Sequence, residues 1–381
     1  MISMYKSLFI AAASLLALSA CSNSTDAPKI PTESDMGAYL MVYHKDADHS
    51  LHMALSYDGY KWSSLRDDKA IICGDTIASQ HGIRDPHIFR GPDGAFYLAM
   101  TDLHIFSQES MRDNPMFSKI SEYRTTQWER DDMYGWGNNH ALVLMKSYDL
   151  INWTRTNLDF ANLTSPTGLY DENGNPYPWS EAGCVWAPEI VYDDEAGHIM
   201  IHFTVRMRND MCVIFYAYVN DDFNKLISDP KILFMSPLGE NGKPKFTVID
   251  SDIIKVNDLY HLFVVSHEGP ACPKHATSKN VTGPYEFDNN YYDGEPEIHE
   301  APNCWKRLGE NKWVLMYDNY HRNPANFGFV ETTDFISFKP IGYFDEEGCP
   351  MTRTNFEAQK HGAVTHLTVE EAKRLEAYYN K

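Results

Sequence analysis

The stretch RDPHIF at residues 84–89 indicates the fold, because three related phrases follow it along the chain. They read WAPEIV at residues 186–191, IDSDII at 249–254 and HEAPNCW at 299–305, and each has an acid within its first four residues. A turn and a second apolar run follow each phrase, at residues 95–100, 198–203, 259–264 and 312–317. This pattern predicts a β-hairpin, copied four times, whose first strand opens on a carboxylate.

A second repeat has the form strand–turn–strand, with a Ser/Thr-x-Asp-like turn that accepts hydrogen bonds from its own backbone. Its five copies lie at residues 54–62, 145–153, 216–223, 275–279 and 330–338. Interleaving the two repeats gives four complete four-stranded units, which start near Asp85, Glu189, Asp250 and Glu300.

The fifth unit is divided between the two ends of the chain. Residues 39–62 supply three strands without an acid-led opener, and residues 361–367 supply an opener without following strands. A C-terminal strand that joins N-terminal strands closes a ring and removes its edges. The sequence therefore predicts an all-β, five-bladed β-propeller. A capping box formed by Thr368 and Glu371 predicts one short helix after it, over residues 368–380.

The chain of 381 residues has a formal net charge of −20, with 43% hydrophobic and 13% aromatic residues. Such a negative surface repels nucleic acids and other polyanions, so we expect no nucleic-acid partner and a neutral substrate. The sequence contains neither a glycine-rich phosphate loop nor cysteines and histidines at zinc spacing.

The N-terminus predicts export and lipid attachment. Lys6 and the apolar run of residues 8–20 form a signal peptide over residues 1–20, and the ending LSAC places Cys21 where a bacterial lipoprotein is processed and lipidated. An ordinary secretory signal with a chance cysteine is the alternative. Residues 21–37 are expected to form a flexible tether, and residues 38–381 the propeller domain. We thus expect a protein of the bacterial cell envelope, periplasmic or on the outer surface, attached to the membrane through Cys21.

The six other cysteines fit no disulfide framework, so we expect mostly free, buried thiols.

Acids that converge on a propeller axis favour glycoside hydrolysis. Inversion at a sugar needs one carboxylate that deprotonates water and one protonated carboxyl that donates to the leaving oxygen, about 6.5–9.5 Å apart. Inner strands of different blades can supply that gap. Neighbouring acids on one strand cannot.

From residue 39 to the C-terminus, the chain resembles glycoside hydrolase family 43. The phrases that carry the resemblance are RDP at 84–86, WAPE at 186–189, ID at 249–250, EAP at 300–302 and KHGAV at 360–364. The resemblance implies an inverting enzyme acting on arabinose- or xylose-containing glycans. It also implies that Asp85 is the general base, Asp250 an orienting and pKa-tuning acid, and Glu300 the general acid. The chain departs from the family's usual Asp-Pro at residues 250–251, its usual Asp at 189 and its usual Glu-Gly-Pro at 300–302.

Two of these assignments have competitors. Asp252 lies on the same face of its strand as Asp250, but the spacing from Asp250 to Ile253 matches that from Asp85 to Ile88. Glu268 belongs to a Glu-Gly-Pro phrase, yet it follows a second strand rather than opening a blade.

We expect the substrate to contact His87, Trp186, Glu189 and His361, although each has a structural alternative: core packing for His87 and Trp186, a salt bridge for Glu189. No cofactor is required. Relatives can hold a calcium ion at the axis, which would lie near His361, where a purely structural histidine is the alternative. Two insertions, residues 107–139 and 157–184, are expected to wall the pocket, with the aromatic and charged residues 128–136 as its rim.

The predicted function is therefore an inverting, exo-acting glycoside hydrolase of plant-type glycans, with α-L-arabinofuranosidase or β-xylosidase activity. One alternative is a retaining fructosyl hydrolase, which would need an Asn-Asp-Pro phrase that the sequence lacks. The other is a glycan-binding lipoprotein without catalysis.

Overall fold

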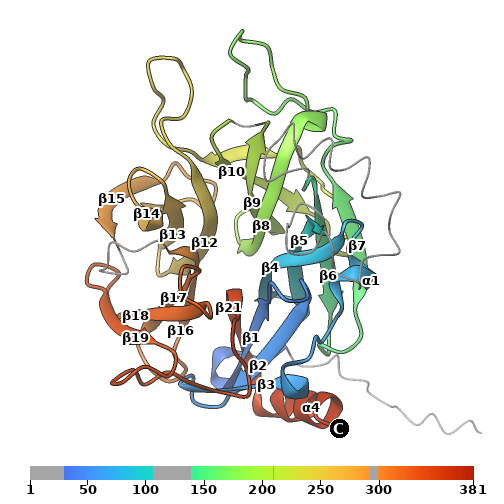
Figure 1. The fold of residues 1–381 in the computed structure, drawn as a ribbon, viewed down its shortest axis with the longest axis vertical. Coiled ribbons are helices and arrows are strands. Elements are labelled where there is room, and N and C mark those ends of the chain that lie inside the picture. Colours follow the sequence, from blue (N-terminus) through green and yellow to red (C-terminus); the bar gives the residue numbers. More distant parts are fainter. Residues whose placement is uncertain (1–29, 106–138, 209, 292–298) are drawn as a thin grey trace, which may run out of the picture. The chain divides into compact units, whose positions relative to one another are not determined.

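The computed structural model describes residues 30–105, 139–208, 210–291 and 299–381. Within them the strands form five sheets, arranged as the blades of a β-propeller (Figure 1). The predicted fold is thus confirmed. The signal peptide, most of the tether, the rim at 128–136 and the insertion at 107–139 except Asn139 lie outside the described residues.

Four blades follow one another along the chain, each with its strands in sequence order from the inner edge outward. Blade 1 contains β4 (His81–Arg90), β5 (Phe96–His104), β6 (Ala141–Ser147) and β7 (Thr154–Asp159), and blade 2 contains β8 (Ala182–Asp193), β9 (His198–Met207), β10 (Val213–Val219) and β11 (Lys231–Phe234). Blade 3 contains β12 (Val248–Val256), β13 (Leu259–Ser266), β14 (Cys272–Ser278) and β15 (Glu286–Tyr291), and blade 4 contains β16 (Glu300–Lys306), β17 (Trp313–Asn319), β18 (Asn326–Thr332) and β19 (Lys339–Tyr343).

Blade 5 joins the two ends of the propeller sequence, as predicted. Its inner strand β21 (Lys360–Thr368) pairs antiparallel with β1 (Met36–His44), which is followed by β2 (Leu51–Ser56) and β3 (Lys61–Ser64). A short strand that the sequence did not predict, β20 (Thr352–Thr354), adds to the outer edge in parallel. The five inner strands contact one another in a closed ring, in the order β4, β8, β12, β16 and β21.

Helices are few. The C-terminal helix α4 (Val369–Tyr379) begins at the predicted capping box, in which the Thr368 side chain accepts from the Glu371 N–H. The other helices of the described residues are the single turn α1 (Gly74–Ile77) and 3₁₀ turns at Glu33–Asp35, Leu65–Asp68 and Trp179–Glu181. Among the described residues, no helix is long and apolar enough to cross a membrane.

The hydrophobic core is divided into five clusters, and each lies between two neighbouring blades. The cluster between blades 5 and 1 includes Leu40, Met100 and Leu367, all fully buried. Full burial of such a side chain stabilises the fold by about 1.5–3 kcal/mol. Because every cluster needs both of its blades, the ring is stable only when it is closed.

The repeated turns also behave as the sequence predicts. In blade 5, the Ser56 hydroxyl accepts from the Gly59 N–H, while Asp58 accepts from two further backbone N–H groups. Blades 1 and 4 repeat this arrangement at Ser147 and Asp149 and at Thr332 and Asp334. All six remaining cysteines are free thiols, and Cys184, Cys212, Cys272 and Cys304 are buried, which confirms that expectation.

Candidate active site

Each inner strand is interrupted by a β-bulge at the same position. Asp85 and Asp250 are bulge residues themselves, whereas Glu300 directly precedes its bulge residue and Glu189 lies two residues after its own. The bulge residues have positive φ angles: 53° at Asp85, 44° at Ala187, 50° at Asp250, 57° at Ala301 and 41° at His361. Residues other than glycine adopt such angles only where the surrounding structure enforces them. The expectation that strands open on their acids is thus corrected for β4, β8 and β12. These strands begin before the acid and continue through the bulge.

Hydrogen bonds between blades hold these bulges in place. The bulge N–H groups of Ala187 and Asp250 donate to the hydroxyls of Thr101 and Thr204 in the preceding blades, at 2.9 and 3.0 Å. In blade 3 the corresponding residue is Val265, which lies opposite Ile249. Its side chain cannot accept a hydrogen bond. There the Asp250 carboxylate itself accepts from the Ala301 N–H, at 3.2 Å.

The other two bulges are held by charged or titratable groups. The His361 N–H donates to Asp318 at 3.3 Å, and the Asp85 N–H donates to His44 Nδ1 at 3.2 Å. A neutral imidazole has one acceptor nitrogen. His44 therefore serves either Asp85 or the Arg84 Nε, which lies 3.0 Å from its Nε2.

Asp85 is held in its ionised form. Its carboxylate accepts from the Thr101 hydroxyl at 2.7 Å and lies 3.2 Å from His361 Nδ1. Burial by itself would raise the pKa of Asp85, but the charge and hydrogen bond of His361, together with Arg84, lower that pKa well below its usual range. An ionised carboxylate in this position can accept a proton from water.

His361 is the cationic partner of Asp85. Burial would lower its pKa, but Asp85, Asp250 and Glu300 raise the pKa of His361 to about 9. The imidazole is thus protonated at neutral pH and has no lone pair for a cation. Calcium prefers oxygen ligands, so the His361 ring does not fit as a direct ligand of the predicted calcium ion, which stays a prediction.

The His361–Asp85 pair predicts a pH-dependent stability. A histidine whose folded pKa is about 9, against about 6.5 unfolded, stabilises the fold fully below pH 6.5, and this contribution is lost as the pH rises through 9. We expect His361→Gln to lower the free energy of unfolding at pH 6 by about 3 kcal/mol, and by much less at pH 10. Denaturant titrations of both proteins at the two pH values test this. An equal loss at both would show that the imidazolium does not stabilise the fold through its charge.

Asp250 lies beside both other predicted acids, and its environment is the opposite of that of Asp85. It is 6% exposed, and its carboxylate lies 4.0 Å from His361 Nδ1. Burial raises the pKa of Asp250, His361 lowers it, and Glu300 and Asp85 raise it again, to about 7. Asp250 therefore keeps a proton to near neutral pH while Asp85 does not.

Glu300 is the first residue of β16, and its side chain is 23% exposed. Its Oε1 lies 3.8 Å from the Lys360 Nζ, which also lies 3.5 Å from the Asp46 carboxylate. Asp46 in turn pairs with Arg84 at 3.3 Å. A chain of alternating charges thus connects the strand that carries Glu300 with the strand that carries Asp85.

These groups line one cavity of about 650 Å³ at the centre of the propeller. Its walls are formed by Asp46, Arg84, Asp85, Thr101, Leu103, Trp186, Arg206, Cys212, Thr247, Ile249, Asp250, His267, Glu300, Tyr320, Lys360 and His361. The Arg206 guanidinium lies 5.4 Å from the centre of the Trp186 ring. A cavity of this size, with aromatic and charged walls, suits a sugar residue.

The structure brings Asp85, Asp250, Glu300, Trp186 and His361 together in this cavity. Glu268 is outside it, with its side chain 55% exposed and paired with Lys274 at 2.5 Å. The insertion at 157–184 contributes no residue to the walls, so the expectation that it walls the pocket is wrong.

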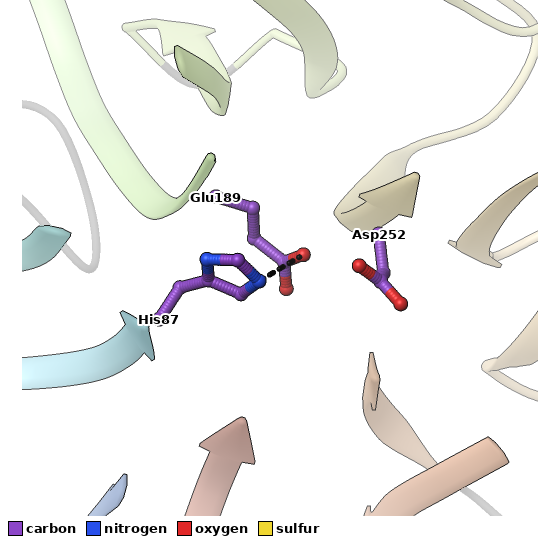
Figure 2. Close-up of side chains that lie close together, drawn as sticks. All are labelled: His87, Glu189 and Asp252. Carbon is purple, nitrogen blue, oxygen red and sulfur yellow. Dashed lines mark ion pairs between the residues drawn. The ribbon is translucent and has the colours of Figure 1, made fainter. Parts of the chain in front are cut away.

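His87 and Glu189 also lie outside the cavity lining, so the geometry does not favour their predicted contact with substrate. Figure 2 shows that they converge with Asp252 from three different blades, in a buried group. His87 Nε2 lies 3.5 Å from Glu189 Oε2. Burial raises the pKa of Glu189, the nearby Asp252 raises it further, and burial raises the pKa of Asp252 to about 6.

The donor atoms of this group lie within 4.8 Å of one another, which is close enough for a metal ion. The histidine does not fit, however. His87 Nδ1 accepts from the Ile190 N–H at 3.2 Å, so the neutral ring carries its hydrogen on Nε2, the nitrogen that faces Glu189. Two members of the group instead connect neighbouring blades: His87 accepts from the Ile190 N–H, and Asp252 accepts from the Cys304 N–H at 2.5 Å. Glu189 Oε2 has no hydrogen-bond partner among the described residues.

Sequence reasoning missed Asp46, Lys360 and Asp318. Lys360 begins the KHGAV phrase, which was a signal for it. Asp46 follows the second strand of blade 5, and Asp318 lies near the end of the second strand of blade 4, both outside the repeated phrases. No signal in the sequence distinguishes them from acids in loops.

Comparisons with known proteins agree with the geometry. Residues 34–373 match a family related to glycoside hydrolase family 43, described as a probable glycosyl hydrolase domain. An α-L-arabinofuranosidase of Bifidobacterium longum is 23% identical over 238 residues, a match that spans 58% of this chain but only 18% of that enzyme.

Solved structures show the same fold. An endo-1,4-β-xylanase structure from Bacteroides thetaiotaomicron has a TM-score of 0.52 at 11% identity, covering 84% of this chain and 94% of that one. A family 43 β-1,3-galactosidase structure has a TM-score of 0.51 at 12% identity, covering 80% and 56%. With a family match across nearly the whole propeller, the chain belongs to the glycoside hydrolase family 43-related group of glycosyl hydrolases.

Proposed function

We propose that this glycosidase is an inverting, exo-acting enzyme that removes an α-L-arabinofuranosyl or β-xylosyl residue from a plant-type glycan. The observation that carries the proposal is the contrast between two acids in one cavity. Asp85 is held ionised by His361 and Arg84, whereas Asp250, beside Glu300, keeps a proton. Inversion needs an ionised base such as Asp85 and an acid that carries a proton, and we assign the second role to Glu300, which lies in the same cavity beside Asp250.

In the proposed reaction, the Asp85 carboxylate takes a proton from a water molecule, and the water oxygen attacks the anomeric carbon. The bond from that carbon to the leaving oxygen breaks as Glu300 donates a proton to this oxygen. One carboxyl gains the proton that the other loses, so the charge of the pair is conserved. The charges of Asp85 and Glu300 both raise the pKa of Asp250, so Asp250 is coupled to the proposed base and to the proposed acid.

The name of the Bifidobacterium relative supports arabinofuranosides as the first substrates to test. The assay is the analysis of free sugars released from arabinoxylan, arabinan and arabinogalactan. We expect free arabinose or xylose as the only early product. Binding of these glycans without any released sugar would instead support a binding protein, and early release of longer oligosaccharides would contradict exo action.

We also propose that the protein is a bacterial envelope lipoprotein anchored through Cys21, on the evidence of its LSAC phrase. Metabolic labelling with a palmitate analogue tests this. Label in the parent and none in Cys21→Ser is the expected result, and an unlabelled parent would favour an ordinary secretory signal.

A further inference from the structure

Asp318 is a buried acid opposite the proposed general acid. It lies near the end of β17, in register with Glu300 on β16, and it is 0% exposed. Its Oδ2 accepts from the His361 N–H, whereas its Oδ1 has no hydrogen-bond partner among the described residues. A fully buried carboxyl group with a single neutral hydrogen-bond donor is costly.

The equivalent positions in two other blades show that the backbone bond does not need an acid. Thr101 lies opposite Arg84 as Asp318 lies opposite Glu300, and Thr204 lies opposite Trp186 in the same way. Both threonines hold the next bulge N–H with a neutral hydroxyl. The carboxyl group of Asp318 therefore provides something beyond the bond to His361.

Lys360 supplies the reason for a second acid here. Its ammonium lies 3.8 Å from Glu300, and a cation at that distance favours the ionised form of a carboxyl group. A general acid must instead carry its proton when the substrate is bound. Asp318 lies in register with Glu300 and accepts from the N–H of the residue that follows Lys360, so the negative charge that it gains on ionisation opposes the effect of the lysine.

We propose that Asp318 is a positioning residue that acts through Glu300 and Lys360 to keep a proton available at Glu300. The inference rests on the proposed function, because it takes Glu300 as the general acid. It assigns Asp318 no contact with the substrate. Asp318 is absent from the cavity walls, whereas Lys360 and Glu300 belong to them.

The charges around the pair agree with this role. Burial raises the pKa of Asp318, Lys360 lowers it and Glu300 raises it, to about 7. Besides Lys360, the titratable and charged groups that act on Glu300 or Asp318 are Arg84 on β4, Asp250 on β12, His267 after β13, Tyr320 after β17 and His361 on β21. Acids that interact this closely titrate as a set, so removing one lowers the pH at which the others lose their protons.

The experiment is a titration that needs no substrate. The full chain is labelled with glutamate carrying ¹³C at its side-chain carboxyl, and the Glu300 signal is assigned by its absence in Glu300→Gln. Asp318→Asn removes the charge and keeps a carbonyl that can accept from the His361 N–H. We expect the titration midpoint of Glu300 to fall by roughly one pH unit in Asp318→Asn.

A second variant and a control make the result specific. Asp318→Thr installs the residue that blades 1 and 2 use and should lower the midpoint equally. Asn303→Ala removes another bond between blades, the one from the Val364 N–H at 3.0 Å. It should lower the melting temperature without moving the Glu300 midpoint.

The activity of the same variants on arabinoxylan distinguishes a failure of the role proposed for Asp318 from a failure of Glu300 as the general acid. If Glu300→Gln is inactive and the alkaline limb of kcat/KM shifts toward acid in Asp318→Asn, both hold. An unchanged or higher Glu300 midpoint in both Asp318 variants overturns the role of Asp318 alone. Full activity of Glu300→Gln on arabinoxylan would instead overturn the proposed general acid.

Discussion

Asp85→Asn should lower kcat by about 10²–10⁴-fold, as expected when a general base is removed. The change keeps the shape of the side chain and its acceptor oxygen for the Thr101 hydroxyl. It removes the negative charge that His361 and Arg84 hold in the cavity, so the attacking water has no group to accept its proton. The measurement is initial-rate kinetics on arabinoxylan and on an aryl arabinofuranoside.

Glu300→Gln should show a comparable loss on arabinoxylan but respond differently to the leaving group. An aryl leaving group needs little protonation, so Glu300→Gln should recover much of its rate on the aryl substrate, and Asp85→Asn should not. The matched control is Glu268→Gln, since Glu268 is exposed and outside the cavity. It should behave as the parent does. Equal responses of the two cavity variants to the leaving group would refute the assignment of base and acid.

Removing residues 360–381 should prevent the propeller from folding stably. Strand β21 pairs with β1 and contacts β4 and β16, so its loss leaves the inner edge of blade 5 unpaired. It also removes Leu367 and Leu375, both fully buried, at about 1.5–3 kcal/mol each. Total stabilities are typically about 5–15 kcal/mol, so the loss of a whole inner strand with its helix exceeds what the fold can tolerate.

Thermal unfolding followed by circular dichroism, together with the soluble yield, tests this. The control deletion begins at residue 370 and removes most of α4 while it keeps β21. It should fold with a lower midpoint. A soluble protein without residues 360–381 that melts like the parent would mean that the ring does not depend on the C-terminal strand.

The blade architecture could be predicted because the blades share the same short sequence repeats. Each acid-led phrase and each Ser/Thr-x-Asp turn is contained within one hairpin, and closure followed from where the repeat was incomplete. The predicted starts of these strands were wrong, because Asp85 and Asp250 lie at bulges inside strands rather than at their beginnings. A bulge adds one residue and shifts the alternation of side chains between the two faces of the sheet, so the residues before it do not continue the strand pattern that follows it.

Predicting the site required more than the repeats. The repeats indicated Asp85, Glu189, Asp250 and Glu300 alike, and the family resemblance selected Asp85, Asp250 and Glu300 among them. The phrases could not distinguish side chains that line the cavity from side chains buried outside it. His87 lies only two residues beyond Asp85, yet it does not line the cavity. Asp318 could be found only from the pairing of β16 with β17, which depends on the three-dimensional register.

The central claim is that water attacks the sugar directly, with Asp85 as its base. Proton NMR of the first sugar released from an α-L-arabinofuranosyl or β-xylosyl substrate, recorded before mutarotation, tests it most directly. The account predicts that the product first forms with the anomeric configuration opposite to that of the substrate, and only later equilibrates. A first-formed product that retains the substrate's configuration would show a covalent intermediate and contradict the role assigned to Asp85.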